Sequence, residues 1–166
     1  MIRCLITLIL IATSVQALAM GNLPSVSLGE GLVGRVAPEF TLGTVSGETK
    51  SLTQARAGKR TMMFFWATWC PHCHEEFESL SQRLDVLKQK GIQIILVDIG
   101  ESKEDVSAYL KRRNLPLDCF LDEDNTVAGQ YSVVGVPTVL LIDEQGVVSA
   151  IEHEFPYDYE TKFNSK

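Results

Sequence analysis

Apolar residues recur along the chain in short blocks, and the spacing inside each block predicts a strand or a helix. Residues 61–67 are apolar almost throughout, as expected for a central strand that is buried on both faces of a sheet. Alternating or apolar patterns bounded by turn residues predict further strands at 39–45, 49–52, 92–99, 117–121, 138–143 and 147–153.

Helical spacing of apolar residues from Phe77 to Leu87 predicts one helix over residues 71–90, with Pro71 in its first turn and Gly91 after its end. Shorter helices are expected from Ser102 to Asn114, around residues 125–131, and after Pro156, where Tyr159 and Phe163 would share a face. Strands that alternate with helices indicate an α/β fold, in which helices flank a central mixed β-sheet and an N-terminal hairpin precedes it.

Length and charge limit the classes of partner. The chain has 166 residues, of which 45% are hydrophobic, and this suits one domain with a single core. The net charge is −6, and the one basic cluster is formed by residues 111–113. An acidic balance of this kind argues against nucleic acid or an anionic membrane as a partner and favours proteins or small thiols.

The first nineteen residues resemble a secretory signal. Arg3 is followed by an apolar stretch at residues 5–12 and by small residues at Ala17 and Ala19, where cleavage is expected. An uncleaved N-terminal membrane anchor is the alternative. Both interpretations place the rest of the chain in the periplasm or another extracytoplasmic space.

Residues 20–35 show no helical or strand periodicity and are predicted to be a linker, so the folded domain is expected over residues 36–166. Cleavage after residue 19 would leave three cysteines, Cys70, Cys73 and Cys119, in a compartment where disulfides persist. Cys119 lies in a predicted strand and is expected to pack as a small apolar residue, the alternative being a third thiol that pairs with a partner.

Two cysteines follow the predicted central strand directly, within the hexapeptide WCPHCH at residues 69–74. A strand that delivers a Cys-x-x-Cys pair to the start of a helix is the layout of a thiol-disulfide redox centre. Cys70 is expected to be the exchanging sulfur, because the free amides and the dipole at a helix start stabilise a thiolate. Cys73, one turn further, would resolve the mixed disulfide. His72 would lower the pKa of Cys70 by charge or by a hydrogen bond.

Three separated motifs carry a family resemblance: APEFTL at residues 37–42, FWATWCPHC at 65–73 and YSVVGVPT at 131–138. In order and spacing they resemble the thioredoxin-like superfamily, in particular the exported TlpA/ResA-type thiol-disulfide oxidoreductases, which have a redoxin domain. The resemblance implies a thioredoxin-like fold with an inserted strand-helix unit. It also implies a cis peptide bond at Pro137 that faces the cysteines.

The same resemblance assigns roles near the cysteines. Val136 would offer its backbone to the substrate beside Pro137, and Trp69 and Pro71 would line the surface where the substrate binds. Glu76 occupies the position of an active-site glutamate in the TlpA/ResA-type proteins and would relay a proton to or from Cys73; the alternative is a solvated residue near a helix start. Thioredoxins proper have a buried aspartate two residues before Trp66, whereas this chain has Phe64.

The direction of electron flow is indicated in two opposite ways. The dipeptide Pro71-His72 is found in periplasmic disulfide oxidases, whereas the whole domain resembles reductants that serve cytochrome c maturation. Reduction or repair of disulfides in extracytoplasmic proteins is favoured, with a disulfide donor of the Cys-Pro-His-Cys type as the alternative. The reaction needs no bound cofactor, but a membrane redox partner or a partner oxidase must reset the pair.

Three other classes of protein share parts of the motif. Residues 70–74 also satisfy Cys-x-x-Cys-His, the attachment pattern of covalent haem, although Met62 and Met63, two of the methionines that could serve as a distal ligand, lie in a predicted buried strand. A copper or zinc module would use both cysteines with His72 and His74, but neighbours on one helical turn seldom complete four ligands. A peroxidase is the third alternative, because residues 37–42 resemble the start of peroxiredoxins.

Overall fold

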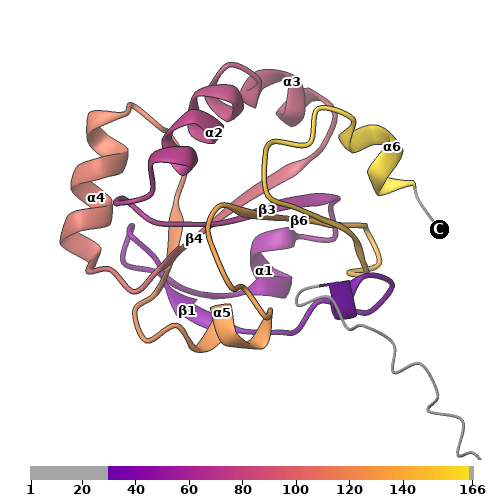
Figure 1. Ribbon diagram of the computed structural model, residues 1–166, viewed down its shortest axis with the longest axis horizontal. Helices are drawn as coiled ribbons and strands as arrows, with labels where there is room; N and C mark the ends of the chain where they lie inside the picture. Colours follow the sequence, from indigo (N-terminus) through magenta and orange to yellow (C-terminus); the bar gives the residue numbers. More distant parts are fainter. Residues whose placement is uncertain (1–29, 165–166) are drawn as a thin grey trace, which may run out of the picture.

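The computed structural model describes residues 30–164, drawn in colour in Figure 1. The predicted signal and the first part of the predicted linker lie outside the described residues. A five-stranded sheet forms the centre, with strand order β5-β4-β3-β6-β7. The middle strand β3 (Thr61–Trp66) is fully buried, as its apolar sequence predicts.

Strand directions make the sheet mixed. β4 (Gln93–Ile99) lies parallel to β3, and β5 (Cys119–Asp122) lies parallel to β4. On the other side, β6 (Thr138–Ile142) is antiparallel to β3, and β7 (Val148–Glu152) is antiparallel to β6. The predicted α/β architecture with a mixed central sheet is confirmed.

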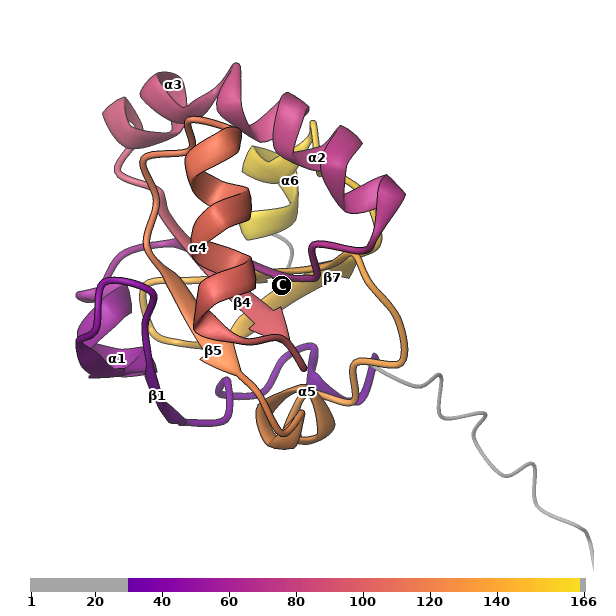
Figure 2. The same ribbon diagram turned by 90° about the vertical axis from the view of Figure 1, so that its left-hand side faces the viewer.

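Helices cover both faces of this sheet (Figure 2). One face carries α2 (Pro71–Ser81), α3 (Leu84–Gln89), α4 (Lys103–Arg112) and α6 (Tyr159–Phe163); the other carries α1 (Leu52–Arg56) and α5 (Thr126–Gln130). Successive side chains of β3 point to opposite faces of the sheet, so the strand contributes to the core on both faces. Phe64 and Trp66 pack on the face with α2, and Met63 and Phe65 pack on the face with α1. No helix among the described residues is long and apolar enough to cross a membrane.

The N-terminal hairpin is present but shorter than predicted. It consists of β1 (Thr41–Gly43) and β2 (Thr49–Ser51), which form a separate two-stranded sheet. The predicted second strand ran to Leu52, where α1 begins instead. Ser51 caps that helix, because its hydroxyl accepts from the amide of Gln54 while the Gln54 side chain accepts from the Ser51 amide.

The single helix predicted over residues 71–90 is wrong in one respect, since it is divided into α2 and α3. At the break, Arg83 has φ −117° and ψ −2°, outside the regular helix. Its guanidinium donates to the Ser79 carbonyl oxygen at 2.9 Å and lies over the Tyr157 ring, 4.8 Å from the ring centre. The break therefore coincides with a contact to a residue far along the chain, which local spacing does not reveal.

The segment before residue 36 also packs on the domain. Residues Glu30–Leu32 form a 3-10 turn, and the Gly34 amide donates to the Val148 carbonyl oxygen at 2.8 Å. The Val148 amide in turn donates to Arg35 at 2.9 Å. Ordered packing thus begins before the predicted domain boundary at Val36.

Candidate active site

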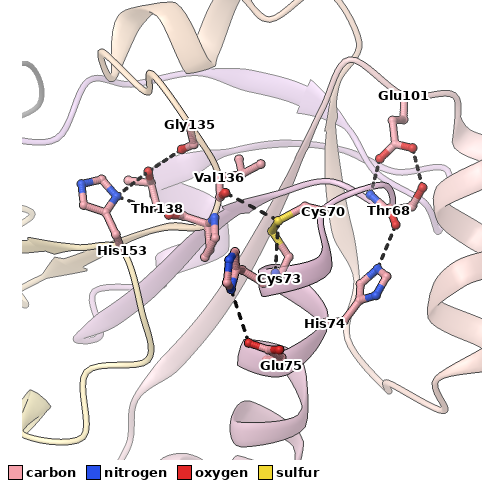
Figure 3. The surroundings of a disulfide bond; sticks show 12 residues. Thr68, Cys70, Cys73, His74, Glu75, Glu101, Gly135, Val136, Thr138 and His153 are labelled. Atoms are coloured by element: carbon pink, nitrogen blue, oxygen red, sulfur yellow. Dashed lines mark hydrogen bonds and ion pairs between the residues drawn. A yellow bond between two sulfur atoms is a disulfide. The ribbon is translucent and has the colours of Figure 1, made fainter.

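The two cysteines lie where β3 passes into α2. Cys70 is the N-cap of α2, Pro71 is its first residue, and Cys73 lies in its first turn. A disulfide bond joins Cys70 to Cys73 (Figure 3). The sequence motif therefore forms the redox-capable pair that its position at a strand-to-helix junction indicates.

The two sulfurs are not equivalent. Cys70 is 3% exposed and Cys73 is completely buried, so Cys70 is the less buried of the two sulfurs. The Cys73 amide donates to Cys70 Sγ at 3.1 Å. This donor at the start of α2 would stabilise a Cys70 thiolate once the disulfide opens.

A loop from the other half of the sheet faces Cys70. The Val136-Pro137 peptide bond is cis, as expected, and the Val136 carbonyl oxygen lies 3.5 Å from Cys70 Sγ (Figure 3). Two exposed apolar side chains are near in sequence to these groups, Trp69 at 64% and Val134 at 71% exposure. A substrate that reached Cys70 would contact the loop on one side and the start of α2 on the other.

The two tryptophans of the motif differ in burial. Trp66 is fully buried and its indole Nε1 donates to Cys119 Sγ at 3.4 Å, whereas Trp69 is exposed. Cys119 is itself completely buried in β5. Burial raises the pKa of the Cys119 thiol far above its ordinary value, which disfavours the reactive thiolate. The predicted packing role of Cys119 is confirmed.

The turn between β3 and Cys70 is held by groups that the sequence reasoning missed. Both oxygens of Glu101 bind Thr68, one accepting from its amide and one from its hydroxyl, each at 2.5 Å. On the other side, His74 Nε2 donates to the Thr68 carbonyl oxygen at 2.9 Å (Figure 3). A signal for Glu101 was available, because it follows β4, and the carboxyl ends of parallel neighbours meet at one edge.

The predicted helper residues lie on the first turns of α2. His72 is exposed, and its Nδ1 lies 3.4 Å from Glu75 Oε2. Glu76 is partly buried and accepts from the Phe155 amide at 2.5 Å. Burial raises the pKa of Glu76, an effect that this hydrogen bond partly offsets. Glu76 and Cys73 are three residues apart on one helix, a spacing that puts them on the same side.

A second carboxyl group was overlooked in the sequence although it interrupts an apolar strand. Asp98 lies in β4, paired in register with Trp66 of β3, and is fully buried. Within the described part of the chain, neither of its oxygens has a hydrogen-bond partner. Burial, with a further contribution from Glu101, raises the pKa of Asp98 to about 8. The buried acid is therefore in β4, whereas the thioredoxin position in β3 holds Phe64.

The described residues contain no group of three or more His, Cys, Asp or Glu side chains that could hold a metal ion. The four side chains considered for a metal module have other partners: the cysteines are bonded to each other, His72 to Glu75, and His74 to Thr68.

A disulfide between a helix N-cap and the first turn, on this sheet topology, defines a thiol-disulfide oxidoreductase of thioredoxin-like fold. The chain belongs to the AhpC/TSA family, whose sequence pattern matches residues 33–151.

Individual relatives agree with this assignment. The chain is 34% identical over 119 residues to the thiol-disulfide oxidoreductase ResA of Geobacillus thermodenitrificans, which covers 72% of this chain and 68% of that protein. The fold is similar to the thioredoxin domain of a thiol-disulfide oxidoreductase from Bacteroides vulgatus, with TM-score 0.69, 28% identity and coverage of 78% and 94%. It is also similar to a thiol:disulfide interchange protein from Bacteroides sp., with TM-score 0.68, 28% identity and coverage of 78% and 86%.

Proposed function

We propose that this protein reduces or repairs disulfides of extracytoplasmic proteins, for example during cytochrome c maturation, through the Cys70–Cys73 pair. The observation that carries the proposal is the asymmetric pair at the start of α2, in which only Cys70 is near the surface. The signal-like sequence at residues 1–19 supports action outside the cytoplasm. The resemblance of the whole domain to reductants of the TlpA/ResA type, which covers more residues than the Pro71-His72 dipeptide, favours the reductive direction.

In the reducing direction, the Cys70 thiolate attacks one sulfur of a substrate disulfide. A mixed disulfide forms, and the second substrate sulfur leaves as a thiolate. Cys73 then loses its proton and attacks Cys70 Sγ, which releases the first substrate thiolate and closes the Cys70–Cys73 disulfide. Two electrons pass to the substrate, so a dithiol donor, proposed to be a membrane redox partner, must supply two electrons to reset the pair.

Roles for the neighbouring residues follow from this sequence of steps. The proton that leaves Cys73 needs an acceptor, and Glu76 is proposed for this role because it lies one turn away and its pKa is raised by burial. His72 is proposed to stabilise the Cys70 thiolate by charge. Trp69, Pro71, Val136 and Pro137 are proposed to form the substrate surface around Cys70, the less buried of the two cysteines.

The experiment that tests the direction is a measurement of the reduction potential in glutathione buffers, with tryptophan fluorescence as the signal and a Cys73→Ser variant as the control that cannot form the disulfide. A value near or below about −270 mV is expected for a reductant. A value above roughly −180 mV would favour the alternative, a disulfide donor, which the Pro71-His72 dipeptide supports. In that case a His72→Ser variant is expected to lower the potential, because the thiolate loses a stabilising charge.

A further inference from the structure

His153 lies beside the loop that faces the disulfide, although the sequence reasoning gave it no role. It follows β7 directly and is exposed. Its Nδ1 lies 3.3 Å from the Pro137 carbonyl oxygen and 3.3 Å from Thr138 Oγ1 (Figure 3). The Thr138 hydroxyl in turn donates to the Gly135 carbonyl oxygen at 2.7 Å.

The hydrogen positions in this cluster follow from the chemistry of its atoms. A carbonyl oxygen only accepts hydrogen bonds, so Pro137 presents a lone pair to the imidazole. The single hydrogen of the Thr138 hydroxyl is directed at Gly135, so Thr138 Oγ1 also presents a lone pair to His153. Both neighbours of Nδ1 are therefore acceptors, and Nδ1 must carry the hydrogen and donate to them.

Strand register explains why the side chain lies there. In the β6–β7 ladder, Val139 pairs with Glu152, so the next pair outward would be Thr138 with His153. β7 ends at Glu152, so backbone pairing between the two strands stops there. The His153 imidazole contacts Thr138 and Pro137 just beyond that point. The side chain thus ties the end of β7 to the segment 135–138, whose Val136 carbonyl oxygen lies 3.5 Å from Cys70 Sγ.

We propose that His153 is a positioning residue for protein substrates, which holds the segment 135–138 so that its backbone can pair with the peptide chain around an incoming cysteine. The inference rests on the proposed disulfide exchange at Cys70 and adds a residue outside the Cys-x-x-Cys motif. Backbone pairing of this kind requires that the segment 135–138 be ordered before the substrate arrives. If the segment is disordered, the affinity for the peptide falls, because the segment must then be ordered on binding. A small disulfide without a peptide backbone needs only Cys70 and gains nothing from the segment.

Two variants distinguish the effect of the Nδ1 hydrogen-bond donor from the effect of side-chain size. His153→Leu removes the hydrogen at a similar volume, whereas His153→Asn places an amide nitrogen near the position of Nδ1 and keeps a donor. Since His153 is exposed, both variants are expected to fold. Ser149→Ala is the matched control, because Ser149 also bridges β7 to β6, by donating to the Leu141 carbonyl oxygen at 3.2 Å, but lies further along the strand pair.

The assay is stopped-flow reduction of two probes by the reduced full-length protein: a peptide with one disulfide, and bis(2-hydroxyethyl) disulfide. For His153→Leu, the second-order rate constant with the peptide is expected to fall about tenfold, and that with the small disulfide to change less than about twofold. His153→Asn is expected to restore the peptide rate to within about threefold of the original, and Ser149→Ala to leave both rates unchanged.

Equal losses with both probes would overturn the proposal, because they would indicate a general effect on Cys70. Unchanged rates in His153→Leu would overturn it as well. If the unmodified protein reduced neither probe, the proposed function itself would fail and the inference with it, so the two failures are distinguishable.

Discussion

The buried carboxyl of Asp98 is expected to make the free energy of unfolding depend strongly on pH. Its carboxyl is fully buried in β4 and its pKa is about 8, compared with an ordinary value of 3.8. Between these values the folded chain keeps a proton that the unfolded chain has lost. The folded state therefore binds more protons, and the free energy of unfolding must fall as pH rises through this window.

The magnitude follows from the size of the shift. Each pH unit inside the window removes about 1.4 kcal/mol, so at pH 7 the accumulated loss is about 4 kcal/mol. Domains of this size are stable by about 5–15 kcal/mol in total, so the effect is a large part of the whole. Asp98→Asn removes the titration at nearly the same side-chain volume. The variant is expected to match the original protein near pH 4 and to become progressively more stable relative to it up to about pH 8.

Urea unfolding of the oxidised protein, followed by the fluorescence of buried Trp66 between about pH 4 and pH 9, measures this difference directly. Asp124→Asn is the matched control. Asp124 is an acid whose pKa is lowered by hydrogen bonds from Thr126, so it stays ionised throughout this window. Its variant should differ from the original protein by a constant amount above about pH 5. Parallel curves for Asp98→Asn and the original protein would refute the reasoning, since Asp98 would then be ionised in the folded state.

Three further outcomes are expected. Cys119 should resist a thiol reagent at about pH 8 in the folded, oxidised protein and react in concentrated urea, because burial raises its pKa; modification without urea would contradict this. Tyr131→Phe should cost about 1–2 kcal/mol in urea unfolding, because its buried hydroxyl donates to the Pro38 carbonyl oxygen at 2.6 Å. Gly146→Ala should lower the unfolding free energy by about 1–2 kcal/mol, because φ is +88° and an added Cβ would lie 2.9 Å from Arg56 Nη1; an unchanged midpoint in either variant would count against these contacts.

Local patterns predicted the parts of this molecule that are determined locally. The apolar run of β3 and the cysteine spacing at the start of α2 were sufficient to locate the disulfide and its burial order. The sequence analysis missed α1 because residues around Ser51 alternate like a strand. The capping box that starts α1 forms only when the Gln54 side chain accepts from the Ser51 amide. The division of the long helix at Arg83 coincides with a contact to Tyr157, which lies 74 residues further along the chain.

Within the site, too, some residues are placed by local sequence and others by contacts between distant parts of the chain. Cys70, Cys73 and Trp69 are placed by one contiguous motif, so their positions followed from the sequence. Glu101 follows the strand that lies parallel to β3, so its place at this edge could have been inferred, whereas the position of His153 depends on the register of β6 with β7. Asp98 was overlooked although it is a lone carboxyl in an apolar strand, because its significance depends on complete burial.

If the chain is exported, as the proposed function requires, its C-terminal segment affects how it assembles. Phe155 stacks near Phe64 of β3, its amide binds Glu76 of α2, and Glu160 pairs with both Arg60 and Lys90. A chain that emerges from a membrane channel N-terminus first would thus present Cys70 and Cys73 to the oxidising exterior before the residues that cover α2 have arrived. The order in which oxidation and folding occur would then depend on the final part of the domain to appear.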